Sequence, residues 1–235
     1  MDEFIRRKLD RILSLFGMGS MEVHLSVKNP SLSTDEIEDY PLIKGREMLL
    51  RATLADGTMG ECFTDKPMNF EGALEDLLEI GTLPSLIAVL NAIMRHRGLI
   101  EKTIHCTGDK PRECSRLLCD YLRIIEPEKI GLIGFQPAFI KSLKETFDGD
   151  IICTDLNPEN VNKTKYGVKI LDGRKYNERV MEKADIILVT GSTIANGTFD
   201  EIMEMGANKR LIFYGTTIAG IAALKGVERF CPLAE

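Results

Sequence analysis

Two absences in the sequence exclude broad classes of function. No apolar run reaches the roughly 18 residues that a membrane-spanning helix needs. There is also no excess of positive charge, since 30 Lys and Arg stand against 36 Asp and Glu and the formal net charge is −6. Binding to a phosphate backbone requires clustered positive charge. The composition therefore predicts a protein with neither a membrane nor a nucleic acid as its partner.

A secretory signal is also missing. The chain opens with acidic residues, and its first apolar residues recur at helical spacing, which predicts an amphipathic helix that ends at Gly17. Without a secretory route, the six cysteines are expected to be thiols in a reducing compartment rather than a disulfide framework. The predicted location is cytoplasmic.

No internal repeat or low-complexity tract divides the chain, so the pattern of apolar residues has to give its organisation. The first half has strand-like stretches followed by helical ones, and Asp56-Gly57 is a dipeptide that favours a tight hairpin turn. This pattern predicts a small α+β domain over residues 1–100, with helices covering an antiparallel sheet. Its expected elements are strands at 21–27 and on both sides of the turn within 47–63, a polar loop at 29–45, and helices at 69–80 and 83–97.

The second half changes to short runs of Ile, Leu and Val that are separated by helical or loop segments. Continuously apolar strands are typical of a parallel sheet that is covered on both faces. The alternation predicts an α/β domain over residues 101–235 with a Rossmann-like, doubly wound sheet. Its expected strands lie at 129–135, 150–155, 185–191 and 209–215, and its helical or loop segments at 137–147, 156–184 and 198–206.

The standard dinucleotide fingerprint GxGxxG does not follow the first of these strands. Gly131 and Gly134 are spaced as GxxG instead, and Phe135 and Pro137 lead into the next helix. Ligands of open α/β sheets bind beyond the carboxyl ends of the strands. Gly134, Phe135 and Pro137 are therefore candidate ligand contacts, and the alternative is that the glycines only let strand and helix pack closely.

Asp155 closes the second strand, roughly 20 residues after the glycine loop, which is the spacing of ribose-binding carboxylates in nucleotide sites. Such a carboxylate accepts hydrogen bonds from both hydroxyls of an adenosine ribose. Asp155 and Asn157 are thus candidate ligand residues, and an adenosine-containing nucleotide is a candidate cofactor. The alternative is a cap for the turn that precedes Pro158.

Small polar residues follow the third and fourth strands. The N-cap of a following helix would account for one of these small polar residues, but not for all of them. Two hydroxyl-rich, glycine-bearing loops at neighbouring strand ends predict a cleft for a polar or anionic ligand. The candidate ligand residues in these loops are Thr190, Gly191, Ser192, Thr193, Asn196, Gly197, Thr198, Gly215, Thr216 and Thr217.

One of the three histidines and three of the six cysteines lie within residues 104–123. A structural zinc site usually takes four ligands in closely spaced pairs, and this stretch has no CxxC pair. Cys114 falls on the apolar face of a predicted helix, where a thiol behaves as a small hydrophobe. The adjacent pair His105 and Cys106 remains as the candidate ligands of a transition metal.

The segments GLIGFQP, TDLNP, TGSTIANGTFDEIM and YGTTIAG, in this order, resemble the heavy-metal-chelation family, a group without an assigned reaction. The resemblance spans nearly the whole chain. It implies a Rossmann-like C-terminal domain, an N-terminal domain similar to the small cap of enolases, and a ligand cleft between them that Asp155 and the Asn196-Gly197-Thr198 turn face. A Cys-rich segment before the Rossmann-like part is matched by HCTGDKPREC. The last loop departs from the family pattern, because Thr216 follows Gly215 where a proline is expected.

Three hypotheses for the function follow. In the first, the protein binds a small polar or anionic, nucleotide-like ligand in an interdomain cleft, as an enzyme or as a binding protein, with a link to heavy-metal chelation. In the second, it binds a transition metal directly through His105 and Cys106. In the third, it is a non-catalytic subunit whose cleft is a partner surface. A homo-oligomer is compatible with all three.

Overall fold

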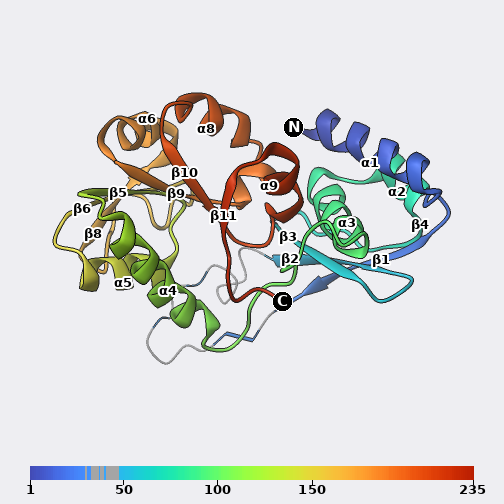
Figure 1. Cartoon of the computed structure of the whole chain (residues 1–235), viewed down its shortest axis with the longest axis horizontal. Coiled ribbons are helices and arrows are strands. Elements are labelled where there is room, and N and C mark those ends of the chain that lie inside the picture. Colours follow the sequence, from blue (N-terminus) through green and yellow to red (C-terminus); the bar gives the residue numbers. More distant parts are fainter. Residues whose placement is uncertain (30, 33–36, 38–39, 41–47) are drawn as a thin grey trace.

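The computed structural model describes residues 1–29, 31–32, 37, 40 and 48–235. Within this part of the chain, two sheets form the frame of the molecule (Figure 1). The antiparallel sheet belongs to the first half of the chain and the larger, mostly parallel sheet to the second half. The α/β fold that the sequence predicts is confirmed. The predicted polar loop at 29–45 lies for the most part outside the described residues.

The strands of the first half are β1 (Glu22–Lys28), β2 (Met48–Leu54), β3 (Met59–Thr64) and β4 (Phe70–Ala73). They form an antiparallel sheet in the order β3-β2-β1-β4. β2 and β3 are the two arms of the predicted hairpin. At its turn Gly57 has a φ of 84°, a left-handed conformation that glycine adopts at little cost. The backbone N–H of Thr58 donates to Oδ1 of Asp56 at 3.0 Å and closes the turn.

The helices of the first half are α1 (Asp2–Phe16), α2 (Leu74–Ile80) and α3 (Leu83–His96). α1 ends at Gly17 as predicted, with Gly17 in the left-handed conformation. The helix predicted over 69–80 is wrong in its first half, because Phe70–Ala73 pairs with β1 as the edge strand β4. The hydrogen bonds of that pairing come from residues about 50 positions away, so local propensity does not indicate them.

α3 packs between the antiparallel sheet and the helices of the second half, and almost all of its side chains are buried. A helix that is apolar all round is typical of the interior of a protein. Gly60 of β3 lets the sheet approach this helix closely. A Cβ atom on Gly60 would lie 2.3 Å from the backbone nitrogen of Ala92 and 2.5 Å from the carbonyl oxygen of Ala88.

The strands of the second half are β5 (Lys129–Ile133), β6 (Asp150–Asp155), β7 (Thr164–Lys165), β8 (Val168–Asp172), β9 (Ile186–Thr190), β10 (Arg210–Tyr214) and β11 (Glu228–Phe230). Among the described residues they form one sheet in the order β11-β10-β9-β5-β6-β8-β7. All neighbours pair in parallel except β7 and β8, which are antiparallel. The chain order of the strands reverses direction between β5 and β9, which is the switch point of a doubly wound sheet.

Helices cover both faces of this sheet. They are α4 (Lys110–Ile125), α5 (Pro137–Thr146), α6 (Gly173–Lys183), α7 (Ser192–Ala195), α8 (Phe199–Met205) and α9 (Ala219–Lys225). Figure 1 shows α4 and α5 on one side of the sheet and α6 and α8 on the other. Along β9, Ile186 and Leu188 are buried in the core with α4 and α5, and Ile187 and Val189 in the core with α6 and α8. The alternation follows from the two-residue period of a strand.

Three strands of this sheet were missed in the sequence. The segment predicted as helical or loop over 156–184 has β7 and β8 before α6, and β11 follows α9 near the end of the chain. All three lie toward the edges of the sheet, and a charged residue interrupts each of them, namely Lys165 in β7, Lys169 in β8 and Arg229 in β11. Edge strands are partly solvated, so they lack the continuous apolar run by which the buried strands are found.

One apolar core runs through both halves of the chain. The same cluster of buried residues includes Leu25 of β1, Leu90 of α3, Val189 of β9 and Ile221 of α9. The domain boundary predicted at residue 100 falls between α3 and α4. The antiparallel and parallel sheets thus lie on opposite sides of this boundary, but they are joined by a continuous interior.

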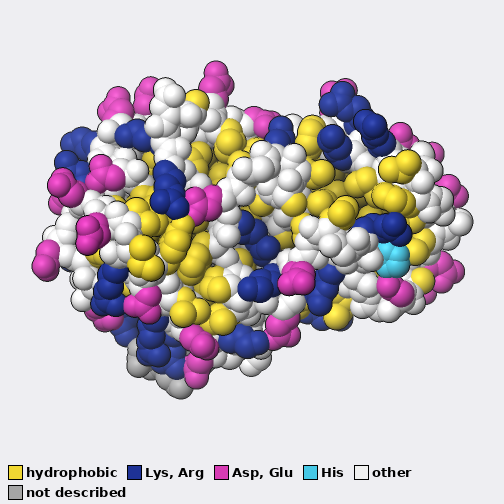
Figure 2. Space-filling view, in the orientation of Figure 1, with side chains coloured by type: hydrophobic (Ala, Val, Ile, Leu, Met, Phe, Trp, Pro, Cys, Tyr) yellow, Lys and Arg dark blue, Asp and Glu magenta, His cyan; other side chains and the backbone are white. Residues whose placement is uncertain are grey.

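The surface mixes both signs of charge. Figure 2 shows Lys and Arg side chains interspersed with Asp and Glu over one face of the molecule, in agreement with the formal net charge of −6. Across the described residues, no helix combines the length and the apolar character that crossing a membrane requires.

Candidate functional site

A large cavity of about 920 Å³ lies at the carboxyl ends of β5, β6, β9 and β10. The loops after these strands form its floor. Other parts of its wall come from residues 63–66 at the end of β3, residues 82–84 at the start of α3, residues 105–106 and residues 230–231, among others. Strands that run in parallel bring their following loops to the same edge of the sheet, and the switch point between β5 and β9 leaves room between those loops.

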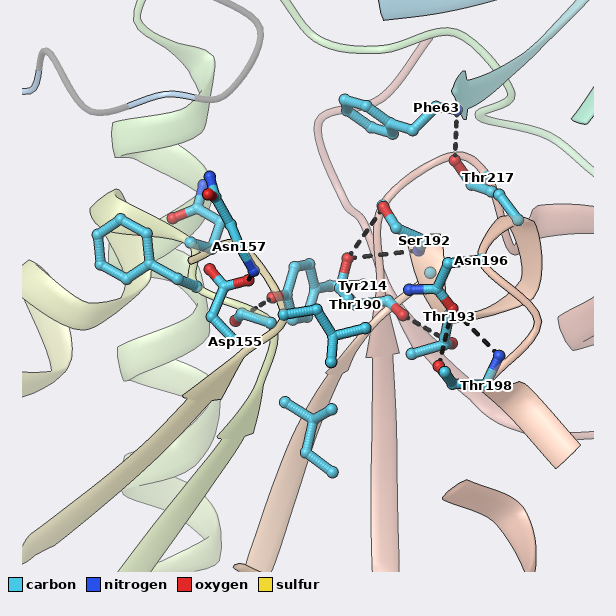
Figure 3. Close-up of a pocket in the computed structure, with 18 of the residues that line it drawn as sticks. Phe63, Asp155, Asn157, Thr190, Ser192, Thr193, Asn196, Thr198, Tyr214 and Thr217 are labelled. Carbon is cyan, nitrogen blue, oxygen red and sulfur yellow. Dashed lines mark hydrogen bonds between the residues drawn. The ribbon is translucent and has the colours of Figure 1, made fainter. Parts of the chain in front are cut away.

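Every ligand residue and both metal ligands predicted from the sequence line this cavity. The structure therefore brings together residues that are far apart in sequence. For example, the hydroxyl of Tyr214 donates to the carbonyl oxygen of Gly134 at 2.9 Å, across 80 positions of sequence. Figure 3 shows Asp155 and Asn157 on one side of the cavity and the residues that follow β9 on the other. That these residues contact a ligand stays a prediction.

Asp155, the last residue of β6, is held in a fixed orientation. Its Oδ1 accepts the backbone N–H of Asn157 at 2.9 Å, and its Oδ2 accepts from Nδ2 of Asn160 at 2.8 Å. The first bond is the turn cap that the sequence offered as an alternative to ligand binding. The carboxylate nevertheless lines the cavity, and each of its oxygens has a second lone pair, so the cap and a ligand contact are compatible.

The loop after β9 is held by side-chain hydrogen bonds between residues that are two or three positions apart in sequence. Oγ1 of Thr190 contacts Oγ of Ser192 at 3.3 Å, and Oγ1 of Thr193 donates to the Thr190 carbonyl oxygen at 2.9 Å. Oδ1 of Asn196 accepts from the backbone N–H of Thr198 at 3.1 Å and from its hydroxyl at 2.8 Å. Thr198 is the N-cap position of α8, but its side chain makes no capping bond. Asn196 instead closes the turn before the helix (Figure 3).

The glycine of the first loop serves packing. Gly134 has a φ of 97°, and a Cβ atom on it would lie 2.5 Å from Cγ2 of Thr190. Its small size therefore lets the loop after β5 touch Thr190 at the end of β9. The close packing of strand and helix, which the sequence left open as the alternative, occurs at Gly131 of β5, where a Cβ atom would lie 2.5 Å from Cγ1 of Val180 in α6. Gly215 also has a φ of 97°, but nothing lies within 4 Å of the position of its Cβ atom.

The loop after β10 is fastened to the antiparallel half of the molecule by Asn91 of α3. Nδ2 of Asn91 contacts the carbonyl oxygens of Glu61 at 2.9 Å and of Thr216 and Thr217 at 3.2 Å each. Its Oδ1 accepts the backbone N–H of Gly220 at 2.7 Å. Asn91 is fully buried, so these bonds form away from solvent. They fix the position of the cavity wall at residues 216–217.

Two threonines of that wall differ in their partners. Oγ1 of Thr217 accepts the backbone N–H of Phe63 at 2.9 Å, which ties β3 to the wall (Figure 3). Oγ1 of Thr216 is buried and has no hydrogen-bond partner among the described residues. A buried hydroxyl without a partner costs about 1–3 kcal/mol, so this atom is a place where a water molecule or a ligand would be favourable.

The predicted metal ligands lie side by side in the wall, and both face the cavity. Nδ1 of His105 is 2.6 Å from the carbonyl oxygen of Cys106. Burial raises the pKa of the Cys106 thiol to about 12, so it stays a neutral thiol near pH 7. Within the described parts of the chain, no group of three or more His, Cys, Asp or Glu side chains is placed to hold a metal ion.

Several wall residues were missed in the sequence. Asn177 of α6 is 2.6 Å from Oγ1 of Thr154, and Phe230 and Cys231 reach the cavity from the end of the chain. Cys114 lines the cavity although it also belongs to the buried face of α4, as predicted. No local pattern indicates these positions, because their neighbours in space are far away in sequence.

Comparison with known proteins bears on the second half of the chain. Residues 117–227 match the DUF364 family. The family is described as "Putative heavy-metal chelation". The matched segment contains β5, the loops after β6 and β9, and α9, and hence most of the floor of the cavity. The resemblance stated from the sequence is confirmed over this segment. A search of curated proteins finds no match.

Two solved DUF364 structures are similar to the chain. One is a protein of unknown function from Pyrococcus horikoshii, with 13% identity, a TM-score of 0.53, and coverage of 91% of this chain and 78% of that one. The other is a protein of unknown function from Desulfitobacterium hafniense DCB-2, with 11% identity, a TM-score of 0.54, and coverage of 96% of this chain and 84% of that one. At these identities the likeness shows the fold alone.

Proposed function

We propose that this protein binds a small polar ligand with a ribose-like diol, such as an adenosine-containing compound, in the cavity between its two sheets. The observation that carries the proposal is the position of Asp155. It is the last residue of β6, the strand next to β5, on the side of the sheet away from the switch point. In doubly wound sheets a carboxylate at this place accepts the two hydroxyls of a ribose.

The cavity supports the proposal by its size and its chemistry. Its volume of about 920 Å³ falls within the range of small-molecule sites, which is roughly 300–1,000 Å³. Asp155 is joined in the wall by the amide side chains of Asn157, Asn160 and Asn177. Amides and carboxylates both hydrogen-bond to hydroxyl groups, and the hydroxyl of Thr216 adds a buried group without a partner among the described residues.

The proposal is tested by binding to purified protein. Adenosine, AMP, NAD⁺ and S-adenosylmethionine are the probes, and isothermal titration calorimetry gives the dissociation constants. We expect at least one probe to bind with a Kd below about 1 mM. Asp155→Asn keeps an oxygen for the turn cap but replaces one acceptor oxygen by a donor, so we expect it to weaken binding about 10- to 100-fold.

Asp150→Asn is the matched control, because Asp150 is the exposed first residue of the same strand, at the opposite end from the cavity. It should bind every probe as the unaltered protein does. If no probe binds below about 1 mM, or if both variants bind equally well, the proposed ribose site is wrong. Native mass spectrometry of the same preparation reports any metal that co-purifies, and a stoichiometric transition metal lost in His105→Ala would favour the metal hypothesis instead.

A further inference from the structure

His105 is held in the cavity wall by contacts on both sides of its backbone. Its N–H donates to Oε2 of Glu61 at 2.6 Å, and the preceding Ile104 exchanges two backbone hydrogen bonds with Glu235, at 2.7 and 2.9 Å. Its imidazole ring stands edge-on to the ring of Phe63, with the centroids 5.3 Å apart and an interplanar angle of 83°. The position of the ring is therefore set by two separate segments of the chain, β3 and the segment that ends at Glu235.

The carboxylate that anchors His105 is fully engaged and neutralised. Glu61 is completely buried, and its Oε1 accepts from Nε and Nη2 of Arg51 at 2.7 and 2.5 Å. Burial raises the pKa of Glu61, and the bonds from His105 and Arg51 oppose that effect. The pair of opposite charges places no net charge beside the imidazole.

The hydrogen bond of Nδ1 fixes the tautomer of the imidazole. Nδ1 of His105 is 2.6 Å from the carbonyl oxygen of Cys106, and a carbonyl oxygen can only accept. Nδ1 therefore carries the hydrogen, and in the neutral ring Nε2 has a free lone pair. No hydrogen bond of the described residues uses Nε2.

We propose that Nε2 of His105 is the hydrogen-bond acceptor that the cavity presents to its ligand beside Phe63. The group of the ligand that lies there is then an uncharged N–H or O–H donor, such as an amide, an amine or a hydroxyl, and not a phosphate or a carboxylate. An anion would face a lone pair and gain no hydrogen bond from it. This inference deepens the proposed function, in which Asp155 holds the diol of the same ligand.

A ligand-free measurement tests the acceptor itself. Long-range ¹H–¹⁵N correlation spectra of protein labelled with ¹⁵N-histidine distinguish the two tautomers and the imidazolium ion, and the signals of His105 are assigned by their loss in His105→Phe. We expect Nδ1–H with an unprotonated Nε2 at pH 7, because Nδ1 faces a carbonyl oxygen that can only accept. An Nε2–H tautomer, or an imidazolium already present at pH 7, would overturn the inference whether or not any probe binds.

A second measurement uses the tightest-binding probe of the adenosine panel and two variants. His105→Gln places an amide oxygen near the position of Nε2, whereas His105→Phe keeps a ring of similar shape but has no acceptor. We expect affinity within about threefold of the unaltered protein for Gln and a loss of about 10- to 100-fold for Phe, as for one lost hydrogen bond. The two variants should have similar melting temperatures, which separates this effect from misfolding.

Equal affinity of the Phe variant and the unaltered protein would overturn the inference and leave the ribose site standing. If no probe binds the unaltered protein, the proposed function fails. The tautomer measurement alone then tests whether Nε2 of His105 is a hydrogen-bond acceptor.

Discussion

The hydrogen bonds of Asn91 lead to a quantitative prediction, because this one side chain joins the antiparallel half of the molecule to the cavity wall. Its Nδ2 has two hydrogens and three carbonyl oxygens within reach, and its Oδ1 accepts one backbone N–H. It can therefore make about three good hydrogen bonds at one time, each contributing about 1 kcal/mol to stability.

Replacing Asn91 by Ala removes these bonds and leaves the backbone N–H of Gly220 buried without a partner. That unpaired group adds at least about 1 kcal/mol to the cost, so we expect the free energy of unfolding to fall by about 4 kcal/mol. Asn91→Asp keeps the shape and the acceptor, but it turns a carboxylate oxygen toward the three carbonyl oxygens. We expect it to be at least as destabilising as Asn91→Ala.

Urea denaturation followed by circular dichroism measures both effects, with the free energy obtained by linear extrapolation. Asn208→Ala is the control, since Asn208 is an exposed residue just before β10 and should change stability by less than about 0.5 kcal/mol. A loss below about 1 kcal/mol in Asn91→Ala would refute the reasoning, because the buried bonds would then contribute little to the joining of the two halves.

Two further predictions concern packing and thiol chemistry. Gly60→Ala should abolish soluble folding or lower the stability by more than about 3 kcal/mol, because the added methyl would overlap the backbone of α3. Gly57→Ala, at the open hairpin turn, should cost only about 1 kcal/mol. Thermal melting compares the stability of the two variants. Cys106 should react with iodoacetamide at pH 8 on the order of 1,000-fold more slowly in the folded protein than in urea, since a pKa of about 12 leaves little thiolate. Peptide mass spectrometry measures this ratio, and equal rates would show that the thiol is not buried as described.

The parts of the fold that the sequence predicts correctly are those where local chemistry and tertiary environment agree. The apolar runs of β5, β9 and β10 need burial on both faces, and the sheet provides it. The Asp56-Gly57 turn and the end of α1 at Gly17 depend on backbone conformations that glycine favours. β4 and β8 were missed because their own sequences lack a continuous apolar run, and it is their pairing with other strands that makes them strands.

The same distinction, between local sequence pattern and tertiary packing, explains which residues of the candidate site could be predicted. Strand ends can be read from the sequence, so the polar residues from Gly134 to Thr217 were found as cavity residues. The wall residues Phe63 and Phe230 could not be predicted in this way. They approach the cavity from the two different sheets, and their positions depend on how those sheets pack together. The tautomer of His105 likewise depends on one backbone carbonyl and the local geometry around it.

The continuous core between the two sheets limits how a ligand can reach the cavity. Leu90 and Met94 of α3 pack against Gly220 at the start of α9, so a hinge motion that separated the halves would expose apolar surface to water. Each 100 Å² exposed in this way costs about 2.5 kcal/mol, and a few hundred Å² would equal the whole stability of a typical domain. We therefore expect the cavity to keep its shape without a hinge motion of the two halves. If the proposed ligand binds, we expect it to enter over the rim of the cavity and not to be enclosed by two closing lobes.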